Sequence, residues 1–247
     1  MTVEDAERAA NLKDAVRRRV WALLEHRSAV HGEAQGRIPN FVGAQAAADR
    51  LAQHPVWGDT RVITTVPDRP QLPVRVRALA DSKLVYMAVP RLAEDLPFYE
   101  LDPRTLPVGP EQAAAREWVA SYAPQVGVEQ MRPVDLVVCG SVAVNREGVR
   151  IGKGAGYTDI EIGLLQEAKL LLAHAVIVTT VHPLQVVDEA LPETGHDFRV
   201  DLIVTPEELI ECRPTRRPPG ILWDDLEPGT IAAIPWLAAR ARQRSTP

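Results

Sequence analysis

The chain has 247 residues, of which 46% are apolar and 25% are charged, and its formal net charge at pH 7 is −5. This composition excludes disordered and fibrous proteins and suits one large α/β domain or two small ones. A basic stripe is missing, which argues against nucleic acid as a partner. The first residues carry charges where a signal peptide needs an apolar core, and no apolar run approaches the ~18 residues of a membrane span, so we expect a cytoplasmic protein.

The first half of the chain alternates between helical and strand-like patterns. Apolar residues at helical spacing, short β-branched runs and prolines mark the elements. In chain order they predict a helix capped by Thr2 and continuing to Leu24, a helix starting near Gly43, a strand over 61–65, a short helix with Pro73 in its first turn, a strand over 83–88, an irregular stretch over 95–110 and a helix over 110–123.

The second half contains runs such as AVIVTTVH and VDLIVT, which are typical of strands buried on both faces of a parallel sheet. The patterns predict a strand from 135, a hairpin turning at 145–148, an amphipathic helix over 159–173, strands over 175–182 and 200–205, and a last helix opened by Pro206. We therefore predict a three-layer α/β/α fold with a mostly parallel, Rossmann-like sheet. Residues 1–211 would form a single domain, followed by a Pro/Arg-rich C-terminal extension over 212–247.

Cys139 and Cys212 lie in apolar surroundings without metal-binding spacing, which predicts two buried thiols. Glu161 and Glu167 have the spacing of a helix surface. His182 follows a predicted strand end, where ligand sites of α/β proteins lie, but a lone histidine there is more often structural.

The stretch GVRIGKGAGYTDIEIG lies between a predicted strand and a predicted helix. It does not fit the Walker A motif, since Gly148 and Gly152 are one residue too close and Gly154 stands where Ser or Thr is required. It does not fit the dinucleotide fingerprint either, because Tyr157 occupies the last glycine position. Two interpretations remain open: a loop whose amides bind an anion at the start of a helix, or a tight turn whose glycines serve only positive φ angles.

The first predicted helix carries two candidate phosphate-binding cations. Lys13 and Arg17 are four residues apart and project from one helical face, although a solvated face is the alternative, since two further arginines follow. Asp159 is a candidate N-cap of the predicted helix.

Several segments in order resemble the 5-formyltetrahydrofolate cyclo-ligases, also called 5,10-methenyltetrahydrofolate synthetases. They are LKDAVRRRVW, VDLVVCGSVAVNREGVRIGKGAGYTD and VHPLQVVDEALPETGHDFRVDLIVTPEEL, and the resemblance covers roughly residues 12–211. The segments RIPNFVGAQAA, VPDRPQLPVR and GKGAGYTDIE are more similar to a divergent branch, the methenyltetrahydrofolate synthetase domain-containing proteins. The chain departs from the enzymes at Thr158, at Ile160 and at Cys139-Gly140-Ser141. It also departs from them at Gln71–Val74, the segment in which the enzymes have a folate-binding glutamate.

The resemblance implies a cyclo-ligase-type fold and a reaction in which Mg-ATP drives the conversion of 5-formyltetrahydrofolate to 5,10-methenyltetrahydrofolate. It implies Lys13, Arg150 and Tyr157 as catalytic residues and Asp159 as a Mg²⁺ ligand. The ATP-binding residues that it implies are Lys13, Arg17, Gly152, Lys153, Gly154, Ala155, Gly156, Tyr157 and Asp159.

Two other functions are kept open. The first is a paralogue that binds ATP but acts on another heterocycle, for example a thiamine-related one, and the second is a non-catalytic binding protein. The expected partner is a small molecule, the folate or another heterocycle, and the protein is expected to be a monomer or a homodimer.

Overall fold

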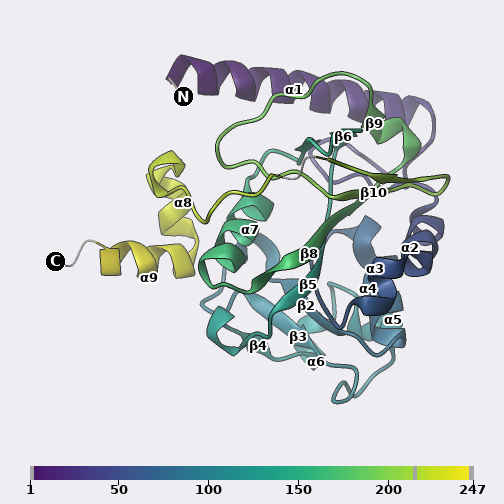
Figure 1. Ribbon diagram of the computed structural model, residues 1–247, viewed down its shortest axis with the longest axis vertical. Helices are drawn as coiled ribbons and strands as arrows, with labels where there is room; N and C mark the ends of the chain where they lie inside the picture. Colours follow the sequence, from purple (N-terminus) through teal and green to yellow (C-terminus); the bar gives the residue numbers. More distant parts are fainter. Residues whose placement is uncertain (1–2, 214–215, 245–247) are drawn as a thin grey trace.

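The computed structural model describes residues 3–213 and 216–244, and the predicted cap at Thr2 lies outside them. An eight-stranded sheet, in the order β11-β10-β8-β5-β1-β2-β3-β4, forms the centre (Figure 1). The strands are β1 (Val62–Thr65), β2 (Leu84–Ala88), β3 (Phe98–Leu101), β4 (Gln125–Val126), β5 (Val134–Cys139), β8 (Leu171–Thr180), β10 (Leu202–Val204) and β11 (Leu209–Glu211). The five strands from β10 to β2 are parallel, whereas β11, β3 and β4 add antiparallel edges.

Helices cover both faces of this sheet, so the predicted three-layer α/β/α fold is confirmed (Figure 1). The helices are α1 (Val3–His26), α2 (Ala44–Gln53), α3 (Pro55–Asp59), α4 (Leu72–Ala80), α5 (Pro110–Ala113), α6 (Val119–Tyr122), α7 (Tyr157–Glu167), α8 (Pro228–Ala233) and α9 (Pro235–Arg244). The central strands are almost wholly buried, because each carries apolar side chains toward both helical layers. Each fully buried Leu, Ile or Val side chain there contributes about 1.5–3 kcal/mol to stability.

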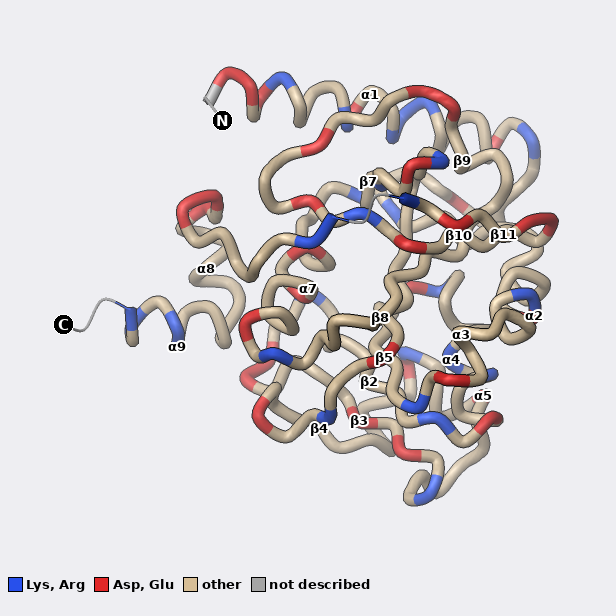
Figure 2. The backbone as a smooth tube through the Cα atoms, in the orientation of Figure 1, with Lys and Arg blue, Asp and Glu red and all other residues tan. Residues whose placement is uncertain are grey.

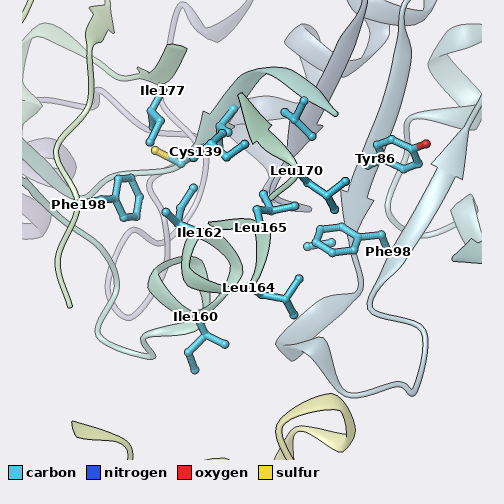
Figure 3. Packing of buried hydrophobic residues seen from close by; sticks show 14 of the residues in the cluster. Tyr86, Phe98, Cys139, Ile160, Ile162, Leu164, Leu165, Leu170, Ile177 and Phe198 are labelled. Carbon is cyan, nitrogen blue, oxygen red and sulfur yellow. The ribbon is translucent and has the colours of Figure 1, made fainter. Parts of the chain in front are cut away.

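Helix α7 contributes to the core on one face of the large sheet (Figure 3). Its Ile162, Leu164 and Leu165 are fully buried and pack in one cluster with Phe98 of β3 and Phe198. Figure 2 shows Lys and Arg interspersed with Asp and Glu along the described chain. No helix within the described ranges is long and apolar enough to cross a membrane.

A second, three-stranded sheet lies beside the first. It consists of β6 (Ala143–Asn145), β7 (Arg150–Ile151) and β9 (Val186–Val187) in the order β7-β6-β9. Strands β6 and β7 form the predicted hairpin. Helix α1 packs its buried Val16, Val20 and Leu24 on this sheet, so the first helix and the start of the glycine loop share one small core.

Four element predictions were wrong. Residues 209–211 form strand β11 rather than a helix, because the Thr205 hydroxyl accepts hydrogen bonds from the amides of Glu207 and Glu208 and turns the chain back along β10. The stretch over 95–110 contains β3, which pairs with β2. The helix expected over 110–123 is split into α5 and α6.

The fourth error concerns the end of α7, which stops at Glu167 rather than near residue 173. Lys169 takes a left-handed φ of 56°, and the Leu170 amide donates to the Leu165 carbonyl, which closes the helix. Glycine usually occupies this position, so the lysine gave no stop signal. Strand β8 then begins at Leu171.

The predicted buried thiols are confirmed. Cys139 and Cys212 are both free and buried, and burial raises the pKa of each thiol to about 11. Part of the predicted extension joins the same core, since Ile234, Trp236 and Leu237 belong to the cluster around α7. The boundary at residue 211 stays a proposal about how the chain is organised.

Candidate functional site

A cleft of about 1500 Å³ opens at the carboxyl edge of the parallel strands. The chain leaves β1 through α4 on one face of the sheet and leaves β5 through α7 on the other. Neighbouring strands whose connections diverge in this way leave a crevice between them, which is where α/β proteins bind ligands. The walls come from α1, the loop after β1, the turn over 88–92, the glycine loop and residues 194–197 and 224–227.

The glycine loop presents a run of free amides to this cleft. Gly154 and Gly156 have φ angles of +102° and +70°, so the turn does need glycine. However, across the described residues the N–H groups of 153–158 donate no hydrogen bond to a protein acceptor. Residues 153–156 are exposed and residues 157–158 begin α7, so all six amides are left for solvent or for an anion, which would satisfy them together.

Two of these glycines also make room for cations. A Cβ at Gly152 would lie 2.7 Å from Nη2 of Arg150, and one at Gly154 would lie 3.3 Å from Cζ of Arg17. The loop backbone therefore rests directly on two guanidinium groups, and side chains at these positions would push them away.

Arg17 links the first helix to the loop, because its Nε donates to the Gly152 carbonyl at 2.8 Å. Burial, and secondarily the positive charge of Arg150, lowers its pKa although nearby carboxylates oppose this. Lys13 lies one turn earlier on α1, lines the same cleft and is 8% exposed. Its Nζ donates to Asp197 Oδ2 at 2.5 Å and to Thr194 Oγ1 at 3.4 Å. Both cations belong to the site wall, so the solvated-face interpretation is wrong for them.

Arg150 and Asp159 form the buried base of the loop. Nη1 of Arg150 lies 3.5 Å from Asp159 Oδ1, and Nη2 donates to the Gly140 carbonyl at 3.0 Å. The guanidinium also lies over the Phe198 ring, 4.8 Å from its centroid. Burial raises the pKa of Asp159, although Arg150 opposes the shift. Asp159 is the third residue of α7 and not its N-cap, which is Gly156, so the capping alternative is wrong.

Lys153 reaches across the cleft to the loop that follows β1. Its Nζ donates to Asp68 Oδ1 at 3.0 Å, and the Lys153 side chain is 37% exposed. No sequence pattern indicates this pair, since its members are 85 residues apart.

The Lys153–Asp68 pair gives a prediction about loop closure. Lys153→Ala should leave the midpoint of thermal unfolding nearly unchanged, because a half-exposed ion pair contributes about 0–1 kcal/mol. It should weaken binding of a polyphosphate by a few-fold, since it removes one charge from the loop. Calorimetry with Mg-ADP measures the second effect, and a large loss of stability would contradict this reading of the pair.

Glu161 is buried in the cleft wall and is not on the helix surface as its spacing indicated. It is 2% exposed, and its Oε1 accepts a hydrogen bond from Thr64 Oγ1 of β1 at 3.2 Å. Burial raises the pKa of this carboxyl to about 7. Glu167, in contrast, is exposed as expected.

Gln71 stands where the resemblance places a folate-binding glutamate. It is fully buried, its Nε2 donates to Thr180 Oγ1 at 3.2 Å, and its Oε1 has no partner within the described chain. Gln71 does not line the cleft. A role in contacting a ligand is therefore not supported by its position.

Comparison with known proteins identifies the family. The model of the 5-formyltetrahydrofolate cyclo-ligase family matches residues 9–206. The chain belongs to this family. Methenyltetrahydrofolate synthase domain-containing proteins are similar to it, at 36% identity over 235 residues for the Mus musculus protein and 34% over 243 residues for the Homo sapiens protein. These alignments cover 91% and 94% of this chain but 62% of each relative, so the chain spans about three fifths of their length.

A solved structure agrees with the cyclo-ligase fold. The NMR structure of Aquifex aeolicus 5,10-methenyltetrahydrofolate synthetase superposes with a TM-score of 0.52 at 21% identity, covering 83% of this chain and 95% of that one. This likeness shows the fold.

The resemblance assigns ten residues to ATP binding, metal binding or catalysis. All ten line this cleft. Their roles stay predictions. Sequence reasoning missed Asp197 as the partner of Lys13, Asp68 as the partner of Lys153, and the burial of Glu161. All three depend on segments that are distant in the sequence, so no local pattern could have shown them.

Proposed function

We propose that this chain is an ATP-dependent cyclo-ligase-like enzyme that converts 5-formyltetrahydrofolate to 5,10-methenyltetrahydrofolate, with ADP and phosphate as the other products. The observation that carries the proposal is the run of unpartnered amides over 153–158 resting on Arg17 and Arg150, with Lys13 in the same cleft. Phosphoryl transfer depends on charge neutralisation and alignment more than on a catalytic base.

The cleft residues fit Mg-ATP. The glycine loop would hold phosphate oxygens through its amides, and Lys13, Arg17, Arg150 and Lys153 would neutralise their charge. Within residues 3–213 and 216–244, no three His, Cys, Asp or Glu side chains cluster as a metal site. A magnesium ion that reaches the protein through one carboxylate, Asp159, and otherwise through phosphate oxygens and water suits such a donor set.

When bound, Mg-ATP supplies the phosphoryl group that activates the formyl oxygen of the folate. The residues of this chain then have three tasks. Arg150 holds the Asp159 carboxylate in place through its own contacts with Gly140 and Phe198. Tyr157, half-buried at the start of α7, positions the phosphates from the side of the helix. Lys13 is held by Asp197, and its ammonium group would stabilise the negative charge on the phosphate oxygens during phosphoryl transfer.

The direct test is the absorbance of methenyltetrahydrofolate. Purified protein with Mg-ATP and 5-formyltetrahydrofolate should give a time-dependent rise that requires both compounds. The reaction without ATP and the reaction with EDTA are the controls. ATP binding without turnover would contradict the folate reaction.

A second function, action on another heterocycle, is favoured by one observation: Gln71 replaces the folate-binding glutamate and lies outside the cleft. It predicts Mg-ATP binding, no turnover of 5-formyltetrahydrofolate and ATP hydrolysis stimulated by a different ring compound. A non-catalytic binding protein would consume ATP with none of these compounds.

A further inference from the structure

Glu161 is a buried carboxyl group of the cleft without a cationic partner. The other carboxylates deep in the cleft each form an ion pair, namely Asp68 with Lys153, Asp159 with Arg150 and Asp197 with Lys13. Glu161 has only the Thr64 hydroxyl among the described side chains, although it is 2% exposed. A buried carboxyl that lacks a cation destabilises a fold, so its presence in a ligand cleft indicates that a ligand satisfies it.

The position of Glu161 along α7 indicates which ligand this is. It follows Tyr157 by four residues on one helix, which places its Cα about 6 Å further along the axis than that of Tyr157, the residue at which the glycine loop enters the helix. A nucleotide base is separated from its terminal phosphate by the ribose and the other phosphates. The group that meets Glu161 one turn from bound phosphate is therefore part of the second substrate.

The cleft that contains this carboxyl also has an apolar wall. Val66, Ala88, Val89 and Leu92 are buried and line the same cleft. The turn that carries the last of them is strained, since Arg91 and Leu92 have φ angles of +62° and +51°. Each such non-glycine conformation costs about 1–3 kcal/mol, and strain of this kind concentrates at ligand sites. A cleft that offers both buried apolar residues and a hydrogen-bond acceptor suits a planar ring with an N–H edge.

We propose that Glu161 determines specificity for the second substrate by accepting hydrogen bonds from the N–H edge of an amino-substituted nitrogen heterocycle that lies against this wall. The inference rests on the proposed function, because it assumes that a nucleotide phosphate occupies the glycine loop. It assigns to Glu161 the ring recognition that the buried Gln71 does not provide.

The test uses the full chain saturated with Mg-ADP and two pairs of probes. One pair is 2-amino-4-hydroxypteridine and 4-hydroxypteridine, and the other is 4-amino-2-methylpyrimidine and 2-methylpyrimidine. Calorimetry should show that at least one amino compound binds about tenfold or more tightly than the partner without the amino group. Glu161→Gln should remove this preference and leave Mg-ADP affinity unchanged.

Glu33→Gln is the matched control, because Glu33 also lines the cleft but is exposed, and it should keep the preference. Glu161→Gln is expected to fold, since it removes a buried carboxyl group that no cation accompanies. Binding of no probe, equal binding of both members of each pair, or a preference that survives in Glu161→Gln would overturn the proposal.

These outcomes are separable from those for the proposed reaction. A wild-type protein that shows the amino preference but makes no methenyltetrahydrofolate has the ring subsite and another substrate. A protein that makes methenyltetrahydrofolate at an unchanged rate and KM in the Glu161→Gln variant has the reaction, and the assignment of Glu161 is then wrong.

Discussion

Replacing Lys13 with methionine is expected to lower kcat/KM of the ATP-dependent reaction by about 10²–10³-fold, which is the usual effect of removing one preorganised positive group from a transition state. Lys13 is 8% exposed and is fixed by Asp197 at 2.5 Å, so water cannot easily replace its ammonium group. The measurement is initial rate by methenyltetrahydrofolate absorbance, with Mg-ADP affinity by calorimetry as the second readout.

The matched control for Lys13 is Arg18→Met, on the same helix. The Arg18 side chain is 64% exposed and pairs with Asp14, so this variant should keep wild-type rates. A double variant, Lys13→Met with Asp197→Asn, separates stability from function. It should recover much of the stability lost in Lys13→Met, because both partners of the buried pair are gone, and recover none of the rate. A Lys13→Met enzyme within threefold of the wild-type rate would refute the catalytic role.

The central sheet was predictable because its strands carry the signal in their own residues. The runs that became β1, β2, β5 and β8 are short and rich in apolar and β-branched residues at successive positions, which is typical of strands buried on both faces. The edges were not predictable in this way. Strands β3 and β11 are short, they lie among prolines or acidic residues, and their pairing with β2 and β10 comes from tertiary contacts.

The site shows the same division. The glycine loop and the Lys13–Arg17 spacing were visible, because each is a local pattern tied to a local geometry. Which of their groups meet is decided by residues far away in sequence, as in the contacts of Lys13 with Asp197 and of Lys153 with Asp68, 184 and 85 residues apart. The burial of Glu161 was missed because its spacing in α7 fits either face, until the position of Thr64 on β1 is known.

Among the proposed variants, Arg150→Met is expected to lower the free energy of unfolding most, by about 3–5 kcal/mol. This is the usual cost of removing one partner from a buried ion pair, about 3–5 kcal/mol. The side chain is 4% exposed, and its loss leaves the buried carboxyl of Asp159 without its nearest cation and the Gly140 carbonyl without its donor. For a chain of this size the midpoint of thermal unfolding should fall by roughly 10 °C, measured by circular dichroism.

Arg146→Met is the control, since this arginine lies in the same hairpin but is 54% exposed and pairs with Glu208 at 2.9 Å. It should cost less than about 1 kcal/mol. Adding Asp159→Asn to Arg150→Met should return part of the lost stability, because the unpaired charge is then removed while the other lost contacts are not. If Arg150→Met and Arg146→Met shift the midpoint equally, Arg150 is not the buried support of the loop. The Arg150→Met variant also tests function. Because the glycine loop contacts Arg150, loss of this side chain should displace the loop amides from a bound anion. Mg-ADP affinity, measured by calorimetry, should therefore fall together with the midpoint of unfolding.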